Sequence, residues 1–550
     1  MTDHSTVPIR RRVRQPPLRA RLAFLSTVAI VLGACTALPP GASYPKFASV
    51  ALAHPEETRL GAQFASAARD HPGTSGFHIL AVGLDGFQVR AQMIDAAQRT
   101  LDLQYFIFRG DETGRLLTDA LLRAADRGVR VRVLIDDGDT VAGDEQIVAL
   151  NAHPSIQIRI FNPFAYRGHN GFLRGLEFLT HADRLDRRMH NKLLIADNAL
   201  ALIGGRNIGN EYFQIDPDGQ FADDDVFAAG PVAGELSATF DEYWNSRFAI
   251  PAEAFAETRR AATTLAAHRE RTRSHPAELV QVSTADKTDY VTRIASGEPY
   301  AGLLSGRIPL EWAAARVVCD SPDKEAILSG ARSGRLMTRD VLDNIRLVHS
   351  ELLMVTPYLV PSAAELSALQ ELRGHAVTVR ILTNSFESAR GLLAYAGYTR
   401  YRVPLLEAGV GLYEARALLG NTRGSGETAR ISRYGNYGLH AKLFVFDREK
   451  IFIGSMNYDQ RSRHLNTEIG LIIESPTLAA QVAARFHAMT EPANAYALAL
   501  RGDSGAGGPR LVWHTQENSR LVDYVHEPAS HAWQRARIRI ISLLPLSGEL

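Results

Sequence analysis

Cysteine is scarce in this sequence, which contains only Cys35 and Cys319 among 550 residues. Two cysteines exclude a disulfide framework and a cysteine-rich zinc site. An excess of basic residues is also missing, because Lys and Arg total 61 against 60 for Asp and Glu, so the overall charge does not indicate a nucleic-acid-binding protein. The hydrophobic share of 45% excludes a disordered or collagen-like chain and is enough for two sizeable cores.

A long hydrophobic run is missing as well. Six arginines precede an apolar stretch at 22–32, which is too short to span a bilayer comfortably and is typical of a secretory signal peptide. The stretch ends in Leu-Gly-Ala-Cys, which resembles a bacterial lipobox and implies cleavage before Cys35 and a lipid on its thiol. We therefore predict a membrane-anchored lipoprotein of the bacterial cell envelope that faces the periplasm. A plain signal peptide or an uncleaved signal anchor is the alternative.

The rest of the chain is built twice. A strand-like segment at 101–108, a helical pattern at 114–127 and a β-branched run at 129–135 predict a β-α-β unit with parallel strands. The same order recurs about 250 residues later, over 351–358, 362–372 and 377–382. Arg132 and Arg380 occupy matching places in the two copies. A long offset that holds over several elements indicates a duplicated α/β domain.

These patterns predict the organisation of the chain. Without residues 1–34 the chain loses six arginines and Asp3, and its formal net charge falls from +1 to −4. The predicted regions are a lipoprotein signal peptide over 1–34, a tether over 35–74, a first domain over 75–255, a linker with helical segments over 256–310, a second domain over 311–500 and a C-terminal tail over 501–550.

Each half ends in the same polar motif. The first contains His190-Asn191-Lys192, four apolar residues, Asp197, six further residues and then Gly204-Gly205-Arg206-Asn207. The second contains His440-Ala441-Lys442, four apolar residues, Asp447, six further residues and then Gly454-Ser455-Met456-Asn457. A lone His near a Lys on a strand is an ordinary exposed polar face, but two copies at corresponding places argue against that interpretation.

Strand geometry assigns these side chains to faces. Residues two apart point the same way, so His190 and Lys192 share a face, as do His440 and Lys442. Asp197 and Asp447 lie at odd offsets and are better placed to hold a turn than to contact a substrate.

The residue types suit a tetrahedral anion. Lysine supplies charge and asparagine supplies donors to phosphate oxygens, so we expect Lys192, Asn207, Lys442 and Asn457 to bind a substrate phosphate. Two imidazoles around one phosphate permit double displacement, in which one attacks phosphorus and the other protonates the leaving oxygen. The lysines neutralise the developing charge, so we expect neither a metal nor a cofactor.

Two intact H-x-K-x(4)-D motifs followed by G-[GS]-x-N make the sequence resemble the phospholipase D superfamily over about residues 75–500. The resemblance implies a duplicated fold of two similar α/β/α sandwich domains with the active site at their interface. It implies a catalytic set of His190, Lys192, Asp197, His440, Lys442 and Asp447, and phosphodiester chemistry through phosphohistidine. His190 is then the expected nucleophile and His440 the expected general acid/base, with the reverse assignment open.

The resemblance also implies an acidic residue that orients each histidine. In the second half it maps onto Glu468. In the first half it falls within Asp223-Asp224-Asp225, where we prefer Asp225 and expect the rest of the triplet to form a solvated turn or a cation site.

The segments 189–192 and 205–213 of the first motif, together with 382–385 and 401–410, resemble bacterial cardiolipin synthases, most closely the C type. This implies transfer of a phosphatidyl group between membrane phospholipids, with phosphatidylglycerol as one substrate and phosphatidylethanolamine as a possible second. The alternatives are a hydrolase, either a phospholipase D or an exported nuclease, and a catalytically silent binding protein, against which the intact motifs argue. Mature acidity favours lipid over nucleic acid. The aromatic segment 162–179 forms either an apolar lip near His190 or a buried core loop.

Overall fold

The computed structural model describes residues 39–138, 147, 150–168, 170–215, 219–255, 263–270, 301–417, 437–502 and 510–542. The predicted signal peptide, Cys35 and most of the predicted linker lie outside these residues. No helix in the described part of the chain is both long enough and apolar enough to cross a membrane.

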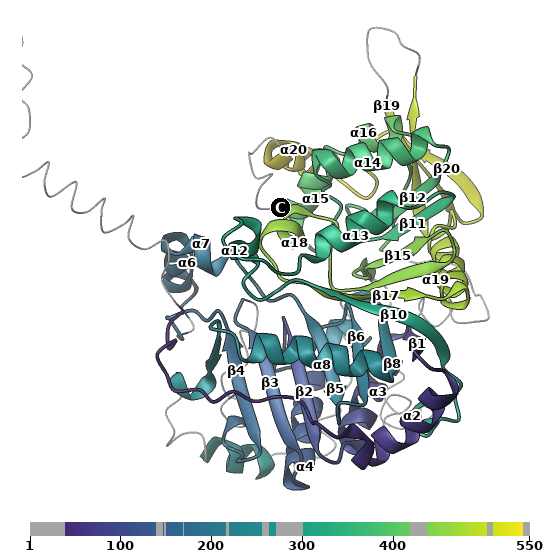
Figure 1. The fold of residues 1–550 in the computed structure, drawn as a ribbon. Coiled ribbons are helices and arrows are strands. Elements are labelled where there is room, and N and C mark those ends of the chain that lie inside the picture. The colour runs from purple at the N-terminus through teal and green to yellow at the C-terminus, as the bar shows by residue number, and fades with distance from the viewer. Residues whose placement is uncertain are drawn as a thin grey trace, which may run out of the picture.

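In the described part of the chain, eighteen strands join edge to edge into one continuous sheet with a first and a second half (Figure 1). In the first half the order is β9 (Ala249–Pro251), β4 (Ile156–Phe161), β3 (Arg130–Asp136), β2 (Thr100–Tyr105), β5 (Lys192–Ala196), β6 (Leu200–Gly204), β8 (Asp225–Ala229) and β1 (Ser75–Leu80). In the second half it is β10 (Glu311–Cys319), β17 (Ile469–Glu474), β16 (Lys450–Gly454), β15 (Leu443–Phe446), β11 (Glu351–Val355), β12 (Thr378–Asn384), β13 (Gly411–Ala415), β18 (Ala495–Arg501), β19 (Arg510–Glu517) and β20 (Arg520–Tyr524).

The two halves meet at the antiparallel pair β1–β10, and from this pair the strand order runs outward in matching fashion on both sides. The predicted β-α-β units are present, with α4 (Glu112–Asp126) between the parallel strands β2 and β3, and α14 (Ala363–Gly374) between β11 and β12. Arg132 pairs with the third residue of β2 and Arg380 with the third residue of β11, which confirms their matching places. The duplicated α/β fold is thereby confirmed.

Helices cover both faces of each half-sheet. A core around α3 (Gly83–Ala96) and α4 fills the outer face of the first half, and a core around α13 (Met337–Arg346) and α14 fills that of the second. The third core combines α8 (Pro231–Trp244) and α19 (Pro476–Met489) with strands of both halves. This shared core holds the halves together and fixes the relative position of the two motifs.

Two terminal regions differ from the predictions. Within the predicted tether 35–74, helix α2 (Arg59–Asp70) buries Leu60 and Phe64 in the first core, so this part of the tether prediction is wrong. The Thr58 side chain caps the helix by accepting from the Gly61 N–H, a signal that the sequence contains. At the other end, β19 and β20 extend the second half-sheet, and α20 (Ala532–Ser542) contacts α15 (Leu392–Thr399).

The remaining elements are short or local. They are η1 (Pro55–Glu57), α6 (Gly171–Thr180), α7 (Ala182–Leu185), η2 (Asn210–Tyr212), β7 (Gln220–Ala222), η3 (Ala252–Ala254), α11 (Ala301–Leu304), α12 (Lys324–Leu328), α16 (Arg402–Glu407), β14 (Tyr437–Leu439) and α18 (Gln460–His464). The strands β7 and β14 form a separate parallel pair between the two halves.

Candidate active site

Each polar motif lies on a hairpin near the contact between the halves. His190 and Lys192 stand at the start of β5, which turns back into β6, while His440 and Lys442 precede β15, which turns back into β16. Both central residues of each turn have positive φ, 53° and 52° in the first hairpin and 54° and 58° in the second. Such turns match the right-handed twist of the strands and return the Gly-x-x-Asn segments to the histidines.

Each histidine is held by a carboxylate from the other half. His190 Nδ1 lies 2.9 Å from one Glu468 oxygen and 3.1 Å from the other. His440 Nδ1 lies 2.5 Å from Asp223 Oδ2. The two contacts cross in opposite directions, so the candidate active site needs both halves of the chain.

Backbone pairing produces this crossed arrangement. The His190 N–H donates to the Thr467 carbonyl at 2.9 Å, and the His440 N–H donates to the Ala222 carbonyl at 2.8 Å. In each case the accepting residue directly precedes the orienting carboxylate. A parallel bridge at Met189 and the β7–β14 pair therefore set the register of both carboxylates against both imidazoles.

The prediction that Asp225 orients the histidine is wrong. Asp225 pairs with Gly204 on β6, and its carboxylate binds Arg90 at 2.8 Å and Arg206 at 3.1 Å. Side chains alternate faces along a strand, but the strand β8 starts at Asp225, so Asp223 lies before it and turns toward His440 instead.

The expectation of a solvated turn or cation site in this triplet is also wrong. All three aspartates are buried, and Asp224 pairs with Arg485 at 3.1 Å. No group of three or more His, Cys, Asp or Glu side chains in the described ranges is placed to hold a metal ion.

The two lysines lie behind the histidines. Lys192 Nζ donates to the His190 carbonyl at 2.6 Å, and Lys442 Nζ lies 3.0 Å from His440 Nδ1. Both ammonium groups are buried, and burial lowers the pKa of Lys192 well below its ordinary value and that of Lys442 to about 8. Burial also lowers the pKa of both imidazoles, with further lowering by Lys192 and Lys442, to about 3 for His440. Each lysine acts on both histidines, so the two motifs converge on one site.

The pKa values of the two orienting carboxylates are shifted in opposite directions. Asp223 is buried, yet the neighbouring His440 and Lys442 hold its pKa below the ordinary value. Burial dominates at Glu468 and raises its pKa to about 7. Glu468 also accepts hydrogen bonds from the Ser455 and Ser462 hydroxyls. The sequence pattern contained Ser455, but its contact with the carboxylate depends on the fold.

The predicted phosphate-binding asparagines are not equivalent. The Asn207 amide donates to the Tyr212 hydroxyl at 2.9 Å and accepts from the Ile107 N–H at 3.2 Å. The Asn457 side-chain oxygen is buried and has no hydrogen-bond partner among the described residues. An amide oxygen accepts hydrogen bonds, so this atom suits a hydroxyl donor of a ligand, whereas a phosphate oxygen would need the amide N–H groups of Asn457.

Asp197 and Asp447 lie at the far ends of their strands. The Asp197 carboxylate accepts from the N–H groups of Gln98, Arg99 and Thr100 at 2.8–2.9 Å. Asp447 accepts equivalent bonds from the N–H groups of His349, Ser350 and Glu351, at the start of β11. These aspartates tie the hairpin turn to the start of the neighbouring strand, as strand alternation predicted, and do not contact the histidines or lysines as the catalytic set implied.

Aromatic rings border the imidazoles. The ring centroid of Phe106 lies 5.0 Å from that of His190, and the Tyr212 and Phe221 centroids lie 5.2 and 4.9 Å from that of His440. Sequence reasoning did not single out these rings. They leave His190 6% and His440 7% exposed, so the imidazoles lie in a largely water-excluded site.

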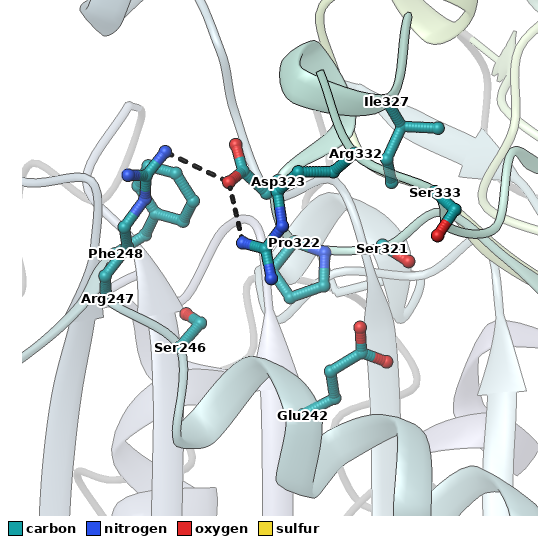
Figure 2. Close-up of a pocket in the computed structure, with 10 residues that line it drawn as sticks. All are labelled: Glu242, Ser246, Arg247, Phe248, Ser321, Pro322, Asp323, Ile327, Arg332 and Ser333. Carbon is teal, nitrogen blue, oxygen red and sulfur yellow. Dashed lines mark hydrogen bonds and ion pairs between the residues drawn. The ribbon is translucent and has the colours of Figure 1, made fainter. Parts of the chain in front are cut away.

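Figure 2 shows a different hollow of about 280 Å³, between the end of α8 and the segment 321–333. Arg247 of the first half and Arg332 of the second both bind Asp323, at 3.0 and 3.3 Å. Its lining contains none of the motif residues, so it is a feature of the contact between the halves rather than the candidate active site.

Comparison with known proteins places the sequence in a family. The family described as "Cardiolipin synthase, PLD-like domain" matches residues 91–244 and 341–490. Cardiolipin synthase C of Escherichia coli (strain K12) is 34% identical over 89% of this chain and 99% of its own length. The major cardiolipin synthase ClsA of Bacillus subtilis (strain 168) is 25% identical over 74% of this chain and 67% of its own. In fold, the chain is similar to phosphatidylserine synthase of Haemophilus influenzae Rd KW20, with a TM-score of 0.53, 13% identity, and coverage of 88% of this chain and 100% of the other.

Proposed function

Because this chain belongs to the phospholipase D superfamily, in its cardiolipin synthase family, we propose that it transfers a phosphatidyl group from one phospholipid to the headgroup hydroxyl of phosphatidylglycerol, forming cardiolipin. The observation that carries the proposal is the pair of buried histidines, each held at Nδ1 by a carboxylate of the other half. With Nδ1 occupied, each Nε2 is the nitrogen that can react.

The reaction follows in two displacements. His190 Nε2 attacks phosphorus, a P–N bond forms, and the P–O bond to the donor headgroup breaks. His440 gives its proton to the leaving oxygen and then takes a proton from the incoming hydroxyl, whose oxygen replaces His190 on phosphorus. Lys192, Lys442 and Asn457 would bind the phosphate oxygens and stabilise their charge.

The charges of the carboxylates support this division of roles. Asp223 stays ionised because its pKa is held low, so a permanent anion faces His440, the imidazole that must carry a proton. A bound phosphodiester adds negative charge beside the lysines and raises the pKa of His440 toward the range a proton carrier needs. Burial and the two lysines lower the pKa of both imidazoles in the free enzyme, so His190, which faces no such permanent anion, stays neutral and keeps the lone pair that attack requires.

A product assay tests the proposal. Purified protein is incubated with labelled phosphatidylglycerol, with and without phosphatidylethanolamine, and the lipids are identified by mass. We expect labelled cardiolipin in the wild type and none in His190→Ala. Phosphatidic acid as the sole product would replace the transferase with a phospholipase D that uses water, and no lipid product would overturn both.

We also propose that Cys35 carries the lipid that holds the enzyme to the envelope membrane on its periplasmic side. Support comes from the Leu-Gly-Ala-Cys pattern and the arginines before it. Metabolic labelling with a fatty acid should mark the wild type but not Cys35→Ser. Equal label in both proteins would exclude lipidation at this position.

A further inference from the structure

Helix α6 exposes its apolar side chains and turns its charged side chains toward the protein, which is the reverse of an ordinary surface helix. Phe172 and Leu179 are each 77% exposed, and none of the ten residues is buried. The polar side chains point inward instead. The Glu177 carboxylate accepts from the Ala165 and Tyr166 N–H groups at 2.7 and 2.8 Å.

The inward face is fixed to the body of the protein. Arg174 donates to the Asp137 carbonyl, and its guanidinium lies 4.2 Å from the centroid of the Phe164 ring. Phe164 itself is buried, so the aromatic segment splits into a buried part and an exposed helix. Because the polar contacts define the orientation of α6, its apolar side chains cannot turn inward without breaking them.

The outward side of α6 carries several large apolar side chains. They are Phe172, Leu173, Leu176, Phe178 and Leu179, between 37% and 77% exposed. Scattered exposed apolar residues need no explanation, but five on one ten-residue helix indicate a surface that contacts something apolar.

The helix is rigidly connected to the candidate active site. After α6, helix α7 is held by Asn162, whose amide donates to the carbonyls of Arg184 and Arg187 at 2.7 and 2.9 Å. The chain then reaches His190, ten residues after α6 ends. Figure 1 shows α6 and α7 projecting at the edge of the molecule beside α12. Whatever α6 contacts is therefore held next to the segment that leads into the site.

The start of the described chain points to the same side. Gly41 lies against Phe255, where an added Cβ would be 3.2 Å from the ring, and the Arg167 guanidinium lies 5.4 Å from the same ring centroid. Arg167 stands four residues before α6. Cys35 precedes Gly41 by six residues, a reach of at most about 22 Å. This reach is long enough for a lipid on Cys35 to enter a membrane that lies on the α6 side.

We propose that the apolar face of α6 inserts into the surface of the phospholipid bilayer from which the enzyme draws its substrates. The occupant is the acyl boundary of the bilayer, because an apolar face on a helix with inward polar groups matches interfacial helices, and the chain start reaches the same side. This deepens the proposed function by naming the surface at which the site works.

Depth-dependent quenching tests the insertion directly. Full-length protein is reconstituted into vesicles of phosphatidylglycerol and phosphatidylethanolamine whose acyl chains are brominated. Phe172→Trp adds a fluorophore on α6, and Leu521→Trp adds one on β20, where Leu521 is 81% exposed. After subtraction of the wild-type signal, we expect strong quenching for Phe172→Trp and none for Leu521→Trp. Equal quenching at both sites, or none at Phe172→Trp, would overturn the proposal, and this readout does not depend on turnover.

A rate comparison links insertion to catalysis. Phe172→Ser with Leu179→Ser should lower turnover on vesicles at least about tenfold, because two large apolar contacts with the bilayer are lost. Turnover on a short-chain phospholipid dispersed as monomers should stay unchanged, and so should both rates in Leu521→Ser. Failure of the wild type on every lipid would contradict the proposed function but not the insertion. An unquenched α6 whose serine variant loses a dimer in sedimentation would instead make this face a contact between two copies.

Discussion

The two histidine sites share one backbone plan but hold their imidazoles with different carboxylates. In the first half the short Asp223 stands against Gly205, where an added Cβ would lie 2.1 Å from Asp223 Oδ1. In the second half the longer Glu468 leaves room for Ser455, whose hydroxyl donates to it. The residue at the glycine-or-serine position of each motif is therefore coupled to the length of the acidic side chain in the same half. That acidic side chain orients the histidine of the other half.

The difference extends to charge. Asp223 faces His440 as a permanent anion, whereas the pKa of Glu468 is raised by burial to about 7. Two sites of equal geometry thus have unequal proton affinity at neutral pH. Duplication thus supplied two copies of one scaffold, and the orienting carboxylates differentiate their roles.

Replacing either histidine should have the largest effect, with unequal consequences for the intermediate. We expect His190→Ala and His440→Ala each to lower turnover by about 10³-fold or more while the fold survives, since each imidazole has a separate task. The reaction with phosphorus-labelled substrate is stopped rapidly without acid, and the label bound covalently to the protein is located. We expect label on His190 in His440→Ala and on no residue in His190→Ala. Label on His440 in the His190→Ala protein would reverse the assigned roles.

Replacing the carboxylates should have the next largest effect. Asp223→Asn should lower kcat by about 10²–10³-fold, because the amide no longer favours the correct tautomer or stabilises the imidazolium. Glu468→Gln should cost less, since the glutamate is already partly protonated near pH 7. Asp225→Asn is the matched control: it should destabilise the fold through Arg90 and Arg206. If Asp225→Asn lost activity without losing stability, Asp225 would be the residue that orients the histidine, as the sequence predicted.

The pH dependence of kcat/KM should distinguish the ionisable groups of the two motifs. Glu468 orients His190 only when ionised, above its pKa of about 7, and Lys442 is charged only below its pKa of about 8. We therefore expect kcat/KM to rise through pH 7 and to fall through pH 8. Glu468→Gln should remove the acid limb and keep the basic one. An unchanged acid limb in that variant would assign it to another group.

The turn aspartates should show the smallest effect, and on stability rather than chemistry. Asp197 is fully buried on three backbone N–H groups, so Asp197→Asn should lower the free energy of unfolding by about 2–3 kcal/mol. Two of the backbone partners of Asp447, His349 and Ser350, are solvent-exposed and the third, Glu351, is half-buried, so Asp447→Asn should cost about 1 kcal/mol because water replaces most of the lost bonds. Denaturant unfolding measures both. Equal losses would mean that the two turns are equally buried in solution.

Much of this site could be predicted because its signals are local. Alternation along a strand predicts that His190 and Lys192 share one face and that Asp197 points to the other. The fixed 250-residue offset predicts the duplication. The orienting acid of the first half could not be found in this way. Glu468 follows Asn457 by 11 residues, whereas Asp223 follows Asn207 by 16, so the offset that serves elsewhere fails here. The choice depends on pairing between strands far apart in the chain.

The same reason limited other predictions. Helix α2 lies within the predicted tether, because its burial of Leu60 and Phe64 depends on a core formed by later strands and has no signal of its own in the sequence. The aromatic segment 162–179 left two interpretations open, since the pattern of α6 does not show which of its faces is held inward. In each case the deciding contact is tertiary, and periodicity alone carries no information about it.

The crossed carboxylates relate the halves as two subunits are related in a symmetric dimer. His190 is held by a carboxylate of the second half and His440 by a carboxylate of the first. The strands β1 and β10 pair where a two-fold axis between the halves would pass. A chain with only one half would need a second copy of itself to supply the carboxylate that orients its imidazole. Covalent fusion removes that dependence on concentration and lets the two copies diverge, so one gene product can keep a fixed anion at one position and a titratable acid at its counterpart.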